Sequence, residues 1–96
     1  PRKIKDIKRA NIENQSKQLL IEILEFLCEE VIMEAGQFQI SRANDFLSKL
    51  ESSSDHSDTF KKAAVQVLSI FDTVVNITKA PMPLSIRVTQ LRSTLH

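Results

Sequence analysis

Residues able to carry out acid–base or nucleophilic chemistry are few and far apart in this 96-residue sequence. The two histidines are His56, in a serine-rich segment, and His96, the last residue. Neither lies in a pattern that brings together a nucleophile, a base and a third group to orient the base. The single cysteine, Cys28, lies among aliphatic residues, where a thiol packs as a small apolar side chain. We therefore expect that the chain is not an enzyme.

Metal and cofactor binding are also poorly supported. Glu22, Glu25 and Glu29 follow helical spacing, but carboxylate metal sites in helical bundles combine glutamate with a Glu-x-x-His pair that is absent here. The segment Asp55–Asp58 could bind a divalent cation weakly, although no further ligands follow at fixed spacing. One cysteine gives neither a disulfide nor an ordinary zinc site. We expect no metal and no cofactor, and we interpret the glutamates as a solvated helix face.

Positive charge is concentrated at the start of the chain, although the net charge is only +1. Residues 1–17 contain six basic and two acidic residues, whereas residues 18–36 contain five glutamates and no base. We interpret residues 1–10 as a basic N-terminal arm and residues 11–96 as a single helical-bundle domain. The arm could contact an acidic partner or several nucleic-acid phosphates, or it could be a solvated tail or a nuclear-import signal. Its basic residues are Arg2, Lys3, Lys5, Lys8 and Arg9.

Nucleic-acid binding through this arm is the alternative function. Two observations weigh against it. No aromatic residue lies within the arm to stack on a base. The helix predicted over residues 41–52 carries as many acidic as basic residues, which suits a phosphate backbone poorly.

The composition predicts an all-α protein. One glycine, no tryptophan and no tyrosine leave few of the residues that short β-strands and their turns need. We predict a small bundle of three to four helices around a long, mostly buried first helix, which extends from an N-cap at Asn11 to Gly36. Ile4 and Ile7 are three residues apart, which leaves open that this helix extends further toward the N-terminus.

Three further helices are predicted from apolar spacing and capping residues. The second begins at Ser41 and extends to about Ser52, and the polar, serine-rich residues 51–58 then form an exposed loop, which also resembles a kinase target. The third is capped by Ser57 or Asp58 and extends to about Lys79, before the prolines at 81 and 83. After Pro83, residues 84–90 fit a helix or an alternating strand, and we prefer a short helix because a single strand would have no partner.

The predicted first helix has more apolar surface than its own bundle can cover. Between Leu19 and Ala35, twelve of seventeen residues are apolar and the other five are glutamates. A surface helix needs an apolar stripe only somewhat wider than about 100°. Leu19, Phe26 and Met33 recur every seven residues and form the first candidate contact line. The opposite flank, formed by Ile21, Cys28 and Ile32, is the second. The other interpretation is that this helix is simply the buried centre of its own bundle.

The function that this pattern favours is a non-enzymatic protein–protein interaction or assembly module, which forms a dimer or binds a partner helix through the apolar first helix. On this hypothesis Phe26→Asp breaks assembly and leaves the helix intact. The apolar stretch is too short and too rich in glutamate to cross a bilayer, so we expect an intracellular protein, nuclear or cytoplasmic, with the nucleus slightly favoured by the basic arm. We expect neither a membrane nor a small-molecule substrate among its partners.

Overall fold

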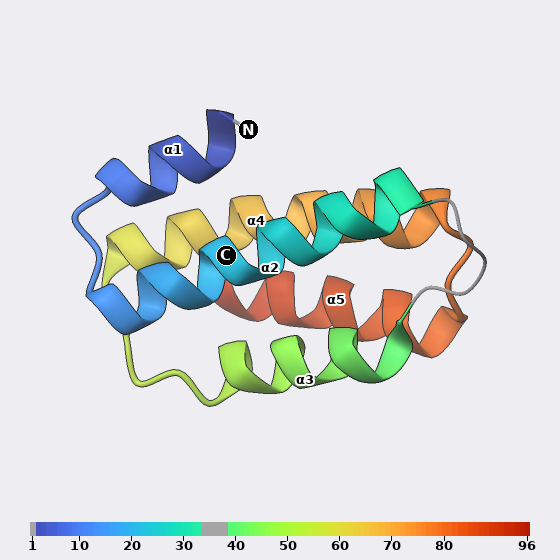
Figure 1. The fold of residues 1–96 in the computed structure, drawn as a ribbon. Coiled ribbons are helices and arrows are strands. Elements are labelled where there is room, and N and C mark those ends of the chain that lie inside the picture. The colour runs from blue at the N-terminus through green and yellow to red at the C-terminus, as the bar shows by residue number, and fades with distance from the viewer. Residues whose placement is uncertain (1, 34–38) are drawn as a thin grey trace.

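The fold consists of five α-helices, and no strand occurs among the residues described (Figure 1). The computed structural model describes residues 2–33 and 39–96, and for residues 2, 3, 32 and 33 it describes the backbone only. The helices are α1 (Arg2–Arg9), α2 (Asn14–Met33), α3 (Ile40–Glu51), α4 (Asp58–Ile77) and α5 (Met82–Leu95). The radius of gyration is 12.7 Å, close to the roughly 13 Å expected for a folded chain of about this length.

The predicted all-α class is confirmed for these residues, but the predicted arrangement is not. The described residues form five helices, and the first of them is short. The long central helix is α2, which packs against α1, α3 and α4, while α5 packs on α4 and α3. Residues expected to form a basic arm contain α1, which lies along α2 at the edge of the bundle (Figure 1). Ile7 is buried in the core and Ile4 packs against it, so this segment contributes to the fold.

The junction between α1 and α2 is fixed by two side chains. The Glu13 carboxylate accepts hydrogen bonds from the backbone amides of Gln15 and Ser16, at 3.1 and 3.3 Å, so Glu13 caps α2 in place of the predicted Asn11. The Lys17 ammonium donates to the carbonyl oxygen of Lys8 at 2.9 Å. A carbonyl in the last turn of a helix has no partner within that helix, so Lys17 satisfies one that α1 leaves free. The predicted end at Gly36 lies outside the described residues.

Local signals set the limits of α4. Ser57 caps its N-terminus as predicted, since its hydroxyl accepts a hydrogen bond from the amide of Phe60 at 3.2 Å. At the C-terminus, Lys79 has a φ of 55°, and the amide of Ala80 donates to the carbonyl of Val75 at 3.1 Å. The amide of Lys79 donates to the backbone carbonyl of Asn76 at 3.3 Å, and the two hydrogen bonds together form a Schellman motif. Glycine is the usual residue in this left-handed position, and lysine occupies it here.

Residues 82–95 form helix α5, so the predicted fourth helix after Pro83 is confirmed and the strand alternative does not occur. Leu84, Val88 and Leu91 are buried at helical spacing, whereas Ile86 is exposed. Helix α3 extends over residues 40–51 and buries Ala43, Phe46, Leu47 and Leu50. Its N-cap residue is Gln39, without a side-chain cap, whereas Ser41 was predicted. No helix in the described part of the chain is long and apolar enough to cross a membrane.

Candidate functional site

The middle of α2 is covered by the chain itself. Phe26, predicted to contact a partner, is 1% exposed, and its ring lies 5.3 Å from the ring of Phe46 on α3. The Arg42 guanidinium lies over the Phe26 ring at 5.0 Å and forms an ion pair with Glu29 at 3.6 Å. A partner could therefore reach Phe26 only if α3 moved away. Phe26 was expected at an external surface, but the structure places it in the core, because α3 packs over this part of α2.

The other residues of the two predicted contact lines are divided between the core and the end of α2. Ile21, at 7% exposure, is also buried, and Leu19 packs against the core while remaining partly exposed. Ile32 and Met33 belong to the last turn of α2, and their side chains lie outside the description. The structure thus brings Phe26 and Ile21 into the core and leaves Leu19 partly exposed.

The large apolar side chains that remain exposed belong to helix ends at one end of the bundle. Within the described ranges they are Val31, Ile40, Ile77, Met82 and Ile86. The C-terminal ends of α2 and α4 and the N-terminal ends of α3 and α5 meet on the right in Figure 1. Ile77 and Met82 are the most exposed, at 63% and 71%. We call these five residues the apolar end.

Sequence reasoning missed most of the apolar end. Ile77 lies within the helix predicted to extend to about Lys79, and Ile86 lies within residues 84–90, which fit a helix or a strand. Periodicity along one helix cannot show where several helices end together, so no signal in the sequence identified this group.

The basic residues predicted to contact nucleic acid or an acidic partner lie on or beside α1. Lys5, Lys8 and Arg9 have exposed side chains. Arg2 and Lys3 also belong to α1, but their side chains lie outside the description. The structure therefore presents three of the five predicted basic side chains on one ordered helix.

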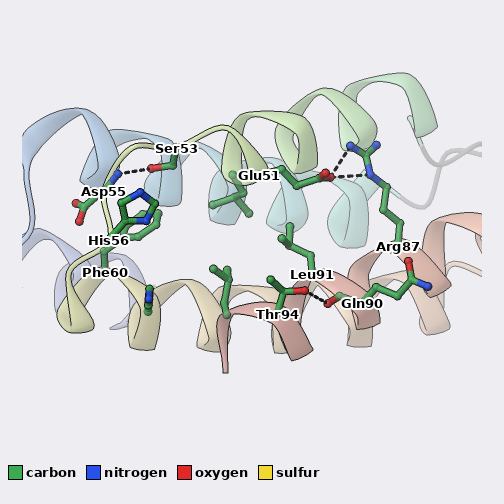
Figure 2. Close-up of a pocket in the computed structure, with 12 residues that line it drawn as sticks. Glu51, Ser53, Asp55, His56, Phe60, Arg87, Gln90, Leu91 and Thr94 are labelled. Carbon is green, nitrogen blue, oxygen red and sulfur yellow. Dashed lines mark hydrogen bonds and ion pairs between the residues drawn. The ribbon is translucent and has the colours of Figure 1, made fainter.

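A groove of about 670 Å³ lies between α3, the loop after it and α5 (Figure 2). Phe60, Leu50 and Leu91, all buried, form part of its lining. Figure 2 shows Glu51 and Arg87 toward one end and Asp55 and His56 toward the other. Its volume lies within the roughly 300–1,000 Å³ of ligand pockets. The possible role of the groove therefore depends on the hydrogen bonds that its polar groups already make.

The polar groups at one end of the groove hold the bundle together. Arg87 donates to the Glu51 carboxylate from Nε at 3.0 Å and from Nη2 at 2.7 Å. Its Nη1 donates to the side-chain oxygen of Asn44 at 2.7 Å, and its Nη2 donates to the Ser48 hydroxyl at 2.8 Å. One guanidinium thus joins α5 to two turns of α3. No sequence pattern indicated this cluster, because Arg87 and Glu51 are 36 positions apart.

The polar groups at the other end form local turns. The Ser53 hydroxyl accepts a hydrogen bond from the amide of Asp55 at 3.2 Å, and the Asp55 carboxylate accepts one from the amide of Ser57 at 3.0 Å. The hydrogen bond from the Ser57 backbone is the main reason that the pKa of Asp55 is lowered, and the Ser57 hydroxyl adds to it. His56 is exposed, and no hydrogen bond joins it to Ser53 or Asp55 among the described residues. This geometry stabilises the loop and does not align a base with a nucleophile.

The remaining chemistry-bearing residues are dispersed. Cys28 is a partly exposed free thiol on α2. Within residues 2–33 and 39–96, no three histidine, cysteine, aspartate or glutamate side chains gather closely enough to hold a metal ion.

Comparison of the sequence with protein-family models and with curated proteins, and of the fold with solved structures, finds no significant match.

Proposed function

We propose that this chain is a non-enzymatic interaction module that assembles with a second copy, or with a helix of a partner protein, through the apolar end of its bundle. The observation that carries this proposal is the exposure of Ile77 and Met82, at 63% and 71%, where α4 ends and α5 begins. Contiguous apolar patches on a protein surface commonly mark interaction sites, whereas single exposed apolar residues are ordinary. The apolar residues here belong to four helix ends that meet.

The proposal changes the contact surface that the sequence favoured. Because Phe26 and Ile21 are buried, a partner meets α2 at its C-terminal turn, where Val31 is exposed. A second copy suits this position, since two identical apolar ends can pair about a two-fold axis with each residue contacting its counterpart or a neighbour. Anchoring by a few large apolar side chains within a polar rim is the usual distribution of energy at such interfaces.

The test is the mass of the protein in solution by light scattering, over a wide range of concentration and at low and high salt. We expect the wild-type protein to dimerise with rising concentration, in a manner insensitive to salt, because the interface is apolar. The double variant Ile77→Glu/Met82→Glu should remain a monomer. The matched control Gln66→Glu/Thr89→Glu changes exposed positions on the same two helices and should dimerise as the wild type does.

Two outcomes count against the proposal. Dimers that persist in the Ile77→Glu/Met82→Glu variant would place the interface elsewhere. A wild-type monomer at every concentration would refute self-association, and the partner form would then be tested with a photo-crosslinker at position 82 and, as control, at position 89. A partner captured from position 82 alone would support the apolar end, and equal capture from both positions would contradict it.

A further inference from the structure

We propose that α1 presents a basic face, formed by Lys5, Lys8 and Arg9, that binds the phosphate backbone of a nucleic-acid duplex without reading its sequence. This surface is separate from the apolar end and does not depend on the function proposed above. The segment predicted to be a basic arm is an ordered helix, and these three charges lie along one side of it.

Helix α1 is anchored to the bundle. Its apolar side consists of Ile7, which is buried, and Ile4, which packs against the core. The ammonium of Lys17 holds the last turn through the Lys8 carbonyl at 2.9 Å. A helix of eight residues is too short to be stable alone in water, so these contacts are what fix it. Charges on an anchored helix can bind without the entropy cost of ordering a free tail.

The three basic side chains of α1 lie close together. Lys5 is three residues from Lys8 and four from Arg9, so the three side chains are neighbours on the helix surface. All three are exposed. The ion pairs in the described part of the chain join Arg42 to Glu29 and Arg87 to Glu51, so neither of them neutralises the basic face. One acidic residue, Asp6, is exposed on the same helix.

The packing of α1 and the burial of the phenylalanines favour a nucleic-acid duplex over a bilayer or a single strand. The apolar side of α1 is packed on the bundle, so it cannot enter the interface of a bilayer as a free amphipathic helix does. The phenylalanines of the described chain, at positions 26, 46, 60 and 71, are all buried. None of them can stack on an unpaired base, which disfavours single strands. The described surface of α1 therefore offers phosphate contacts, and these suit a duplex.

The experiment measures binding of the full chain to a fluorescently labelled DNA duplex by polarisation at several salt concentrations. Three phosphate contacts give a slope of about −2.7 for log K against log salt, which means about 40-fold weaker binding at about 200 mM than at about 50 mM salt. The variant Lys5→Gln/Lys8→Gln/Arg9→Gln should lose this binding. The matched control Lys61→Gln/Lys62→Gln/Arg92→Gln removes the same charge from α4 and α5 and should keep the wild-type slope. Far-UV circular dichroism verifies that both variants fold.

Several results would overturn the proposal. Absence of binding at the lowest salt would do so directly. An equal loss in both variants would show a response to net charge rather than to α1. Competition by poly-glutamate at equal charge concentration as strong as that by unlabelled duplex would point to an acidic protein partner, and stronger binding to anionic lipid vesicles would point to a membrane surface.

Discussion

Replacing Phe26 tests the central feature of this fold, which is that α2 buries its apolar surface within its own chain. The ring is 1% exposed and pairs with Phe46 at 5.3 Å under the Arg42 guanidinium. Truncating a buried phenylalanine to alanine costs about 3–5 kcal/mol, and the lost ring pair adds about 1 kcal/mol. A chain of this length has a free energy of unfolding of about 5–14 kcal/mol. Phe26→Ala should therefore remove a large part of the stability, and Phe26→Asp, which also buries a charge, should unfold the chain.

The chain has no tryptophan or tyrosine, so urea unfolding is followed by far-UV circular dichroism. We expect Phe26→Ala to lower the urea midpoint by about 1–6 M, given the m-values of about 1–3 kcal/mol/M of small proteins. Ile77→Ala, at a side chain that is 63% exposed, is the control and should change stability by less than about 0.5 kcal/mol.

The reasoning fails if Phe26→Asp keeps the wild-type helical signal and urea midpoint while a dimer dissociates. That result would mean that Phe26 faces a partner and that α3 does not cover it. It would also restore the contact line predicted from the seven-residue spacing of Leu19, Phe26 and Met33.

Three further predictions concern single side chains. Arg87→Lys should destabilise the chain by about 1–2 kcal/mol in urea unfolding, because an ammonium cannot reproduce the forked contacts of the guanidinium with Glu51 and α3; an unchanged midpoint would show that the cluster contributes little. Lys79→Gly should raise the free energy of unfolding by about 0.5–1 kcal/mol, because glycine adopts the left-handed φ of 55° without steric cost; a lower midpoint would contradict this. The pKa of Asp55 is lowered in the folded state by the hydrogen bond from Ser57, so its stabilising contribution is present above its unfolded pKa and is lost as pH falls through the folded one. Asp55→Asn should accordingly reduce the loss of stability on acidification between about pH 5 and 3, measured by unfolding at a series of pH values; a pH profile identical to that of the wild type would show that the hydrogen bond does not couple to folding.

Elements whose signals are local were predictable from the sequence. Helix α4 has a serine cap, a clean apolar face and prolines shortly after its end, and each signal acts within a few residues of the backbone that it shapes. The same holds for α5, where Pro83 near the N-terminus favours a helix and the spacing of Leu84, Val88 and Leu91 provides its buried side. The all-α class follows from such signals, since composition and periodicity agree throughout the chain.

Features that depend on contacts between distant segments were decided only by the tertiary structure. Ile4 and Ile7 are too few to identify a stable helix in isolation, and α1 exists because α2 receives them. The excess apolar surface of α2 suggested a partner from the sequence, but α1, α3 and α4 pack against this helix, since packing against any available apolar surface satisfies the same hydrophobic pattern. The sequence by itself determined the all-α class, the approximate positions of α2 to α5 and which of their faces are apolar. Which of those faces meet one another, and which remain exposed at the apolar end, depended on how five helices share one core.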